Sequence, residues 1–345
     1  MENEIEIFYS KDWSFDPTQG KLDYELLDTG EGEKLERFGP YIFVRPYEDA
    51  VWPKALTKEM KELWNRADGK FWSSKQGAKS GWKFNHKIEK KWIMEYKPAR
   101  HASQGDASGG IKFLASPTPF RHLGFFPEQA SHWDFIEEKI RARVSFNFEL
   151  PEGPNSVIGG RAQGRKIGGN SGPGVRFLNL FGYTGMASLF ALRAGAEVTH
   201  IDASKSSIEW AKENQKISGL EKMPMRIICD DVLKFIEREG KRGNKYDAVI
   251  MDPPKFGRGP KGEVWNIEKD LPRLLNAVRK ILSDKPLFVI LTSYAVDSFS
   301  LPLGYALSEM MKSFSGTVKA GELCILEKSQ NRLIPLANTA IWSAV

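Results

Sequence analysis

The stretch from Val175 to Asp202 constrains the fold of this chain more than any other. Its apolar run at 177–181 is typical of a buried parallel strand, and a turn with glycines at positions 182 and 185 follows. An apolar helical pattern comes next and closes at Gly195, and a second apolar run then leads into Asp202. Strand, glycine turn, helix, strand and acid in this order predict one half of a doubly wound α/β sheet.

The turn and the acid together indicate a nucleoside cofactor. Glycines let backbone N–H groups approach a ligand closely, and Asp202 lies near the offset of about 20 residues at which a carboxylate binds ribose hydroxyls. A nicotinamide dinucleotide would also need the pyrophosphate-binding glycines of G-x-G-x-x-G, whereas this turn keeps only two glycines. S-adenosylmethionine has no pyrophosphate and suits the relaxed turn better. The competing interpretation is an ordinary doubly wound sheet in which Asp202 is a surface residue.

The alternation of strands and helices continues to the end of the chain. We expect strands at 225–229, 247–251 and 287–291, helices at about 131–143, 204–218, 270–282 and 299–314 and from 232, and a closing strand pair at about 321–327 and 333–342. Five strands with crossover helices and a terminal hairpin make an α/β fold, a Rossmann-like doubly wound sheet with an antiparallel C-terminal edge.

The first 120 residues have a different composition and predict a smaller β-rich module. Residues 1–50 carry 5 basic and 13 acidic side chains, residues 54–121 carry 15 basic and 6 acidic ones, and seven of the ten tryptophans precede residue 134. Alternating apolar and polar residues at about 22–51 predict a small antiparallel sheet. Phosphates attract cations and unstacked bases pack on flat rings, so this module suits RNA binding. A solvated basic face over a tryptophan-containing core explains the same pattern.

We therefore divide the chain into this module at 1–120 and a cofactor domain at 121–345, with a flexible insertion at 151–174 that holds eight glycines. Cys229 and Cys324 make neither a disulfide framework nor a zinc site, and we expect no bound metal. No run is long and apolar enough to span a membrane and the acidic start is not a signal peptide, so we predict a cytoplasmic protein. The net charge of +6 permits nucleic acid as a partner.

Carboxylates follow three of the predicted strands, at Asp202, Asp231 and Asp252. Ligands of open α/β sheets bind beyond the carboxyl ends of the strands. Asp231 can accept from an adenine amino group, and Asp252 lies where a methyl group would leave. The prolines of Asp252-Pro253-Pro254-Lys255 fix φ and remove two N–H donors, so a stiff loop presents the Asp252 carboxylate and a proline carbonyl to an amine. The alternative is that Asp and Pro mark the start of a helix.

These motifs resemble those of the class I S-adenosylmethionine-dependent methyltransferases. The resemblance rests on N-L-F-G-Y-T-G at 179–185, Asp202, Cys-Asp-Asp at 229–231 and D-P-P-K-F at 252–256. With H-L-G-F-F-P-E-Q at 122–129, the chain is similar, more narrowly, to the bacterial large-subunit ribosomal RNA methyltransferases of the I and K group over about residues 120–345.

The resemblance implies S-adenosylmethionine as the cofactor and gives two sets of candidate residues. The cofactor-binding set is Gln129, Asn179, Phe181, Gly182, Tyr183, Thr184, Gly185, Asp202, Ala203, Asp230, Asp231, Val232 and Asp252. The catalytic set is Asp252, Pro253, Pro254, Lys255 and Phe256. In this interpretation Asp252 orients or deprotonates the acceptor, Lys255 positions it, and Phe256 or Tyr294 stacks on its ring.

The leading hypothesis is methylation of a nucleobase of RNA, in particular ribosomal RNA. Members of the group that make 5-methylcytosine have a cysteine at the end of the fifth strand, whereas this chain has Thr292-Ser293-Tyr294 there. Carbon methylation needs a thiolate nucleophile, so the sequence supports an amine as the acceptor. Two alternatives stay open: methylation of a protein or small molecule, and an RNA assembly factor that binds the cofactor without turnover.

Overall fold

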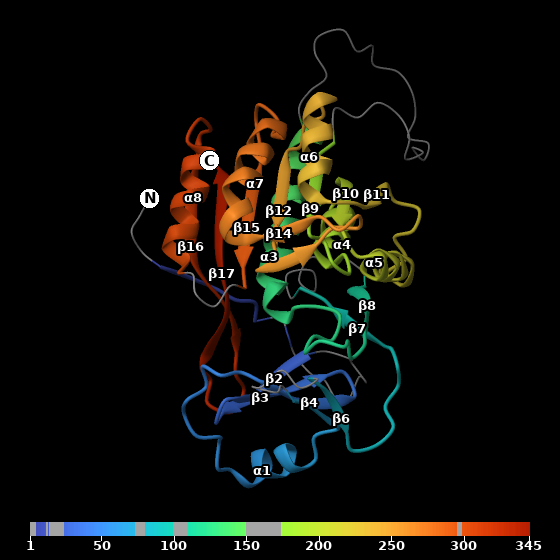
Figure 1. Cartoon of the computed structure of the whole chain (residues 1–345), viewed down its shortest axis with the longest axis vertical. Helices are drawn as coiled ribbons and strands as arrows, with labels where there is room; N and C mark the ends of the chain where they lie inside the picture. Colours follow the sequence, from blue (N-terminus) through green and yellow to red (C-terminus); the bar gives the residue numbers. More distant parts are fainter. Residues whose placement is uncertain are drawn as a thin grey trace.

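The computed structural model describes residues 5–11, 13, 24–72, 80–98, 109–149, 174–294 and 299–345. Its described part is built around an eight-stranded sheet of order β1-β16-β17-β15-β12-β9-β10-β11 (Figure 1). The strands from β15 to β11 are parallel, and β17 is antiparallel to both β15 and β16. The predicted fold class is confirmed, because this Rossmann-like α/β sheet lies beside a separate, smaller β-rich sheet. The predicted insertion at 151–174 falls, except for Gly174, outside the described residues.

The large sheet consists of β1 (Glu6–Phe8), β9 (Arg176–Leu180), β10 (Glu197–Asp202), β11 (Met225–Cys229), β12 (Ala248–Met251), β15 (Phe288–Ser293), β16 (Gly316–Leu326) and β17 (Leu333–Ala344). The helices around it are α3 (Ala130–Glu149), α4 (Met186–Arg193), α5 (Lys205–Ile217), α6 (Val232–Lys241), α7 (Ile267–Ile281) and α8 (Ser300–Met311). Each strand and helix predicted after residue 174 is present. Helix α7 starts earlier than expected because the Asn266 side chain accepts from the N–H groups of Glu268 and Lys269 and caps its first turn. No helix in the described part of the chain is long and apolar enough to cross a membrane.

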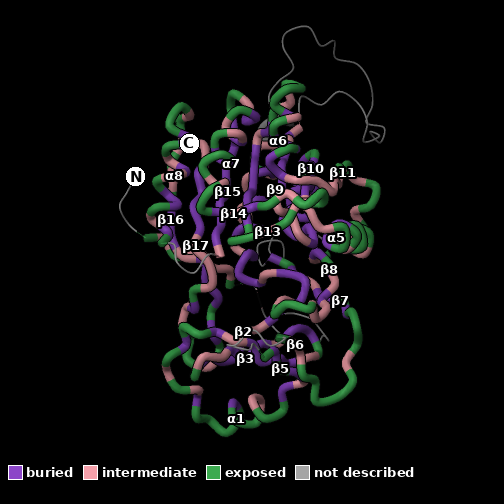
Figure 2. The backbone as a smooth tube through the Cα atoms, in the orientation of Figure 1, coloured by how far each residue is buried: buried purple, intermediate pink, exposed green. Residues whose placement is uncertain are grey.

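Hydrophobic side chains cover both faces of the large sheet, as expected of parallel strands between two helix layers. Along β12, Ala248 and Ile250 pack in one cluster with residues of α3 and α4, whereas Val249 and Met251 pack in a second cluster with residues of α6, α7 and α8. Strands β12 and β15 are buried from end to end (Figure 2). The polar residues that follow these strands are therefore the ones placed to meet a ligand.

The strand order reverses between β9 and β12. The chain continues from β9 to β10 and β11 on one side and returns to β12 on the other side. Such a reversal opens a crevice at the carboxyl ends of the strands. Leu180, the last residue of β9, pairs with Ile201 on one side and with Met251 on the other. The glycine turn after β9 consequently starts beside both Asp202 and Asp252.

The N-terminal sheet has the order β2-β3-β4-β5-β6. Its strands are β2 (Tyr24–Gly30), β3 (Glu33–Phe38), β4 (Tyr41–Pro46), β5 (Gly69–Trp72) and β6 (Gly81–Phe84); α1 (Lys58–Asn65) packs on one face, and β7 (Trp92–Tyr96) pairs with β8 (Ile111–Ala115). The antiparallel sheet predicted at 22–51 is confirmed by β2, β3 and β4. Strand β5 then joins β4 in parallel, which makes the whole sheet mixed.

Two segments differ from the prediction. The segment around Arg258 and Lys261, for which no strand is predicted, forms a hairpin of β13 (Phe256–Arg258) and β14 (Val264–Asn266), because Gly262 with φ 87° permits a tight turn between the two strands. Strand β1 pairs in parallel with β16 and so belongs to the large sheet, although it precedes the N-terminal sheet in sequence. The domain boundary at residue 120 stays a prediction.

The hairpin of β16 and β17 connects the two sheets. In Figure 1 its long strands run from the large sheet to the N-terminal sheet, where Glu327 forms a bridge with Leu26 of β2. Arg332 donates from Nε to Glu327 Oε2 (2.7 Å) and from Nη2 to Oε1 (2.9 Å), and Thr29 Oγ1 donates to the same Oε1 (2.5 Å). Glu327 is fully buried, and these donors compensate for the water that its carboxylate has lost.

Replacing Glu327 by glutamine should destabilise the protein. The amide places an N–H₂ group against the donors of Arg332 and leaves the guanidinium without its counter-charge, so we expect a loss of about 1–3 kcal/mol in the free energy of unfolding. Urea unfolding measures it. Glu309→Gln, which removes an exposed ion pair with Lys312 on α8, is the matched control and should leave unfolding unchanged. Equal unfolding midpoints for both variants would show that the contact between Glu327 and Arg332 contributes nothing to stability.

Candidate active site

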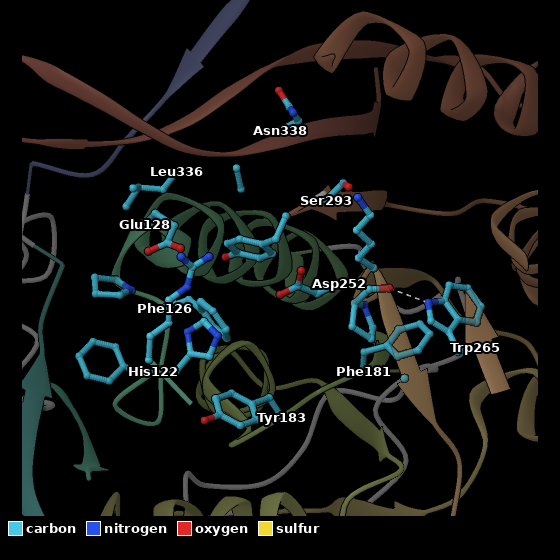
Figure 3. Close-up of a pocket in the computed structure, with 18 of the residues that line it drawn as sticks. His122, Phe126, Glu128, Phe181, Tyr183, Asp252, Trp265, Ser293, Leu336 and Asn338 are labelled. Atoms are coloured by element: carbon cyan, nitrogen blue, oxygen red, sulfur yellow. Dashed lines mark hydrogen bonds between the residues drawn. The ribbon is translucent and has the colours of Figure 1, made fainter. Parts of the chain in front are cut away.

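A cavity of about 1030 Å³ opens at the carboxyl ends of the central strands (Figure 3). The predicted site residues in its lining are Phe181, Tyr183, Asp202, Ala203, Asp231, Val232, Asp252, Pro254 and Lys255. Gln129, Asn179, Gly182, Thr184, Gly185, Asp230, Pro253 and Phe256, all described by the structure, are not part of that lining. The cavity also extends to the N-terminal sheet and to the β16–β17 hairpin, so chain segments far apart in sequence enclose one space.

The turn after β9 has an unusual backbone. Its φ angles are 60° at Phe181, 50° at Tyr183 and 91° at Gly185. Residues other than glycine adopt such angles rarely, and each costs about 1–3 kcal/mol. The Gly182 N–H donates to the Ile201 carbonyl (2.9 Å) and the Gly185 N–H to the Gly182 carbonyl (3.0 Å), so the turn is fixed by its own backbone. Backbone strain of this kind at a cavity wall is a mark of function.

A buried side chain supports the turn from below. A Cβ atom placed on Gly182 would lie 2.3 Å from Cε1 and 2.4 Å from Nδ1 of His200, so only glycine fits above this ring. The His200 ring is positioned by Ser188 (3.0 Å), which accepts from Asn179 Nδ2 (3.0 Å). Asn179 and Gly182 thus shape the cofactor turn from behind. Thr184 fixes the other side of the turn by donating to the Gly124 carbonyl (2.5 Å).

Asp202 retains acceptor capacity for a ligand. Its Oδ2 accepts from the Tyr183 N–H (2.9 Å) and its Oδ1 from the Ser204 N–H (2.8 Å), which leaves further lone pairs on both oxygens. Loss of solvent raises the pKa of Asp202, and the backbone donors oppose that rise. The carboxylate is therefore fixed in orientation and lines the cavity.

The two acids after β11 have different environments. Asp231 caps α6 by accepting from the Lys234 N–H (2.9 Å) and lines the cavity. Asp230 instead forms an ion pair with Arg238 and accepts from the Asp231 N–H (2.9 Å). Of this pair, Asp231 is the one placed to meet a cofactor.

Asp252 has one oxygen that is bonded and one that is not. Gln129 Nε2 donates to Asp252 Oδ2 (3.1 Å) and also to the Tyr294 hydroxyl (3.0 Å). Asp252 Oδ1 is buried and has no hydrogen-bond partner among the residues that the structure describes. Loss of water around the carboxyl raises the pKa of Asp252 to about 8, and the carboxylate of Glu128 adds to this rise. Such an unpartnered acceptor is costly unless a ligand uses it.

A buried histidine fixes the orientation of Gln129. Burial lowers the pKa of His132 to about 3, so its ring is neutral. Its Nδ1 lies 2.6 Å from Gln129 Oε1 and its Nε2 lies 3.1 Å from Thr339 Oγ1. The hydrogen-bond network assigns the proton to Nδ1, because Gln129 Oε1 can only accept. The amide of Gln129 then points its two N–H bonds at Asp252 and Tyr294, and Asp252 Oδ1 stays available.

Glu128 links this network to the N-terminal sheet. It is buried, lines the cavity, and accepts from the Tyr294 hydroxyl. Burial raises the pKa of Glu128, while the nearby Lys34 and Arg45 act against the rise. Lys34 and Arg45 also line the cavity, and both bond to Glu36 on β3. Buried charges of the N-terminal sheet therefore lie close to Glu128, whose carboxylate also acts on Asp252.

The loop after β12 is supported by the β13–β14 hairpin. Trp265 Nε1 donates to the Pro254 carbonyl (2.7 Å), and the rings of Phe181 and Trp265 lie 5.0 Å apart. In Figure 3, Asp252 lies between this pair and the rings around Phe126. Phe256 is 56% exposed and pairs within the hairpin. Tyr294, which lines the cavity, is better placed than Phe256 to contact an acceptor.

Comparison with known proteins shows the family to which this chain belongs. The profile of a family described as S-adenosylmethionine-dependent methyltransferase matches residues 97–296. The chain belongs to this family. Ribosomal RNA large subunit methyltransferase K of Neisseria meningitidis is 32% identical over 121 residues, which is 34% of this chain and 34% of that protein. Ribosomal RNA large subunit methyltransferase K/L of Shewanella frigidimarina is 38% identical over 121 residues, or 34% of this chain and 17% of that protein. The matches therefore span about a third of the first relative and less than a fifth of the second.

Solved structures extend the comparison to the whole chain. A SAM-dependent methyltransferase from Agrobacterium tumefaciens is 35% identical, with a TM-score of 0.79 over 99% of this chain and 94% of that one. A protein from Streptococcus mutans is 15% identical, with a TM-score of 0.62 over 92% of this chain and 74% of that one, and shows the shared fold alone. The predicted family, enzyme class and cofactor are confirmed.

The residues of the cavity fit S-adenosylmethionine. Asp202 offers free lone pairs beside Phe181 and Tyr183 of the turn, and Asp231 and Val232 continue the same wall. Asp252, with its unpartnered Oδ1, lines the same cavity. No group of three or more His, Cys, Asp or Glu side chains in the described ranges could hold a metal ion.

Sequence reasoning missed the residues that act through Asp252 and those contributed from a distance. Phe126, Glu128 and His132 lie within or just after the quoted 122–129 stretch, but they received no role there. For His132 the sequence did contain a signal. Gln129 and His132 are three residues apart at a helix start, a spacing that places both side chains on one face of the helix. Lys34 and Arg45 on the N-terminal sheet carried no local signal at all.

Gly182→Ala should impair cofactor binding and stability together. The added methyl would collide with His200, whose ring cannot retreat because Ser188 holds it. We expect a loss of about 1–3 kcal/mol in stability and a rise of about tenfold or more in the Kd for S-adenosylhomocysteine. Calorimetry with S-adenosylhomocysteine and urea unfolding measure the two effects. Gly174→Ala, with no atom within 4 Å of its added Cβ, is the control. An unchanged Kd in Gly182→Ala would contradict the assigned packing.

Asp252→Asn should stabilise the cofactor-free enzyme, and more so as the pH rises. The pKa of Asp252 is about 8 in the folded protein and about 4 in an unfolded chain. Between these values the unfolded chain loses its proton first, so rising pH costs the wild type stability and leaves the amide variant unaffected. The advantage of the variant should grow by about 1 kcal/mol or more between about pH 5 and pH 8. Denaturant unfolding across this range tests it, with the exposed Asp284→Asn as control; parallel curves for wild type and Asp252→Asn would refute it.

Proposed function

We propose that this methyltransferase transfers the methyl group of S-adenosylmethionine to an amino nitrogen of an RNA base. The observation that carries the proposal is the buried, unpartnered Oδ1 of Asp252. An amino group bound there donates one N–H to Oδ1 and directs its lone pair into the cavity. The aromatic wall of Phe126 and Tyr294, whose centroids are 4.9 Å apart, gives a flat base a surface to pack on.

The cysteines support nitrogen over carbon as the acceptor. Methylation at pyrimidine carbon needs a thiolate to attack the ring. Cys229 and Cys324 are both described, and neither lines the cavity. Loss of solvent raises the pKa of Cys229, and it raises the pKa of Cys324 to about 12, so both remain thiols at neutral pH. The acceptor atom must then be nucleophilic by itself, as an amine nitrogen becomes when its lone pair is freed from the ring.

Catalysis in this proposal is mainly alignment. When bound, the cofactor supplies an electrophilic methyl group on a positively charged sulfur that leaves without needing a proton. The stiff Asp252-Pro253-Pro254 loop, supported by Trp265, fixes the direction from which the amine approaches. In its ionised form, which predominates above its pKa of about 8, Asp252 accepts the N–H bond during attack and then takes the proton that the methylated nitrogen must lose. Gln129 keeps the other carboxylate oxygen in place throughout.

RNA is proposed as the substrate for two reasons. Relatives with this catalytic region are named as ribosomal RNA methyltransferases, and the module before it is rich in cations and aromatic rings. Phosphate neutralisation and base stacking are the interactions that bind RNA without duplex geometry. Ribosomal RNA as the target would also place the enzyme in the cytoplasm. Label found in protein or small molecules in the experiment below would favour the other acceptor classes.

Asp252→Asn should abolish methyl transfer while cofactor binding persists. The variant replaces the unpartnered acceptor with a group that cannot take a proton, so we expect a loss in kcat of about a thousandfold with the Kd for S-adenosylhomocysteine within about threefold of wild type. The assay is transfer of tritiated methyl into total RNA from a strain that lacks this gene. Asp284→Asn is the matched control and should be fully active. Wild-type enzyme that labels no RNA would overturn the substrate, whereas an active Asp252→Asn would overturn the residue's role.

A further inference from the structure

A rigid turn at the rim of the cavity presents an aromatic side chain to solvent. Phe120 is 72% exposed, yet the turn around it is closely held. Thr118 Oγ1 donates to the carbonyls of Phe120 (3.0 Å) and His122 (2.8 Å), and the Thr118 N–H donates to the same His122 carbonyl (3.1 Å). Prolines at positions 117 and 119 restrict the backbone further.

Neighbouring elements fix the same turn from outside. Trp82 Nε1 on β6 donates to the Thr118 carbonyl (2.9 Å) and lies 3.3 Å from the Phe120 carbonyl. Arg45 Nη1 on β4 donates to the Arg121 carbonyl (2.9 Å). Carbonyls along the turn are thus bonded one after another, and the Phe120 ring is held outward by a fixed backbone. A single exposed apolar residue is ordinary, but one fixed outward at an active-site rim is not explained by packing.

The turn leads directly to the catalytic group. Arg121 and His122, the two residues after Phe120, line the cavity. The ring of His122 lies 4.8 Å from Phe126, and Phe126 lies 4.9 Å from Tyr294, whose hydroxyl accepts from Gln129 beside Asp252. Burial lowers the pKa of His122 to about 3, so this ring is uncharged and presents a flat surface. A row of rings therefore runs from the rim to Asp252.

A second flat surface adjoins the turn on the outer side. Phe84 on β6 is 39% exposed and stacks on Trp82, with ring planes 5° apart and centroids separated by 5.9 Å. Lys83 between them is exposed, as is about half of the Arg121 side chain. Exposed rings alternating with cations are the chemistry that binds single-stranded nucleic acid, where bases stack and phosphates are neutralised.

We propose that Phe120 is the stacking site for an unpaired nucleotide that neighbours the target base. The base stacks on the exposed ring, and Arg121 takes the phosphate that joins it to the nucleotide entering the cavity. The edge of β6 continues the path for the next nucleotide. This inference rests on the proposed RNA substrate and adds that the strand must be unpaired at the target, since a duplex could not splay two bases onto separate rings.

Binding of a fluorescein-labelled oligoadenylate of about 12 nucleotides tests the proposal by anisotropy, with S-adenosylhomocysteine present and about 0.1 M salt. Phe120→Ala should raise the Kd by about fivefold to a hundredfold. Phe120→Trp should retain binding, because it preserves the flat ring. Phe120→Leu should bind as weakly as Phe120→Ala, because it keeps apolar bulk but loses the ring. Tyr305→Ala on α8, which removes another exposed ring, is the control and should bind as wild type.

The variants should also separate binding from chemistry. With RNA from the strain that lacks the gene, Phe120→Ala should raise the KM for RNA by a similar factor and leave kcat and the Kd for S-adenosylhomocysteine unchanged. Wild-type affinity in Phe120→Ala, or full affinity in Phe120→Leu, would overturn the stacking site, as would no oligoadenylate binding by the wild type. Oligoadenylate binding that depends on the ring, in an enzyme that methylates no RNA, would instead support the stacking site and refute the proposed function.

Discussion

The pairing of β9 between β10 and β12 is the constraint on which the site depends. Because Leu180 is hydrogen-bonded in register with Ile201 and Met251, the residues that follow these three strands emerge side by side. The turn after β9, Asp202 and Asp252 therefore lie together, and the Tyr183 N–H of the turn also donates directly to Asp202. The pairing itself is made secure by hydrophobic side chains that bury both faces of the strands. The binding geometry is in this sense a consequence of the core.

The site stores unfavourable features that the core must offset. Phe181 and Tyr183 adopt left-handed backbone angles, and Asp252 is held with a buried oxygen to which no described residue donates a hydrogen bond. Each would lower stability in isolation. All three residues line the cavity, and a bound amine would give the Asp252 oxygen the donor that it lacks. The free enzyme thus gives up some stability to hold these groups in the arrangement in which they meet a ligand.

The sequence predicted what depends on local pattern and missed what depends on distant contact. The glycine turn, Asp202 and the loop at Asp252 are each specified within a few residues, and the structure places each of them at the carboxyl end of its strand as expected. A role for Gln129 in cofactor binding stays a prediction, and its bond to Asp252, 123 residues away, was not foreseen. His132 is orientated by Thr339, 207 residues away. No period or motif encodes such pairs, because they exist only after α3 packs on the sheet.

The N-terminal sheet and the β16–β17 hairpin enclose the part of the cavity that lies beyond Asp252. Pro335 and Leu336 of the hairpin line the cavity, while a few residues away Glu327 and Arg332 secure the hairpin to the N-terminal sheet. Tyr47 adds a bond from its hydroxyl to the Pro335 carbonyl (2.9 Å). The same sheet fixes the Phe120 turn through Trp82 and Arg45. The distance between the outer rings and Asp252 is therefore set by the joint between the sheets, and a change in that joint must alter substrate recognition before it alters cofactor binding.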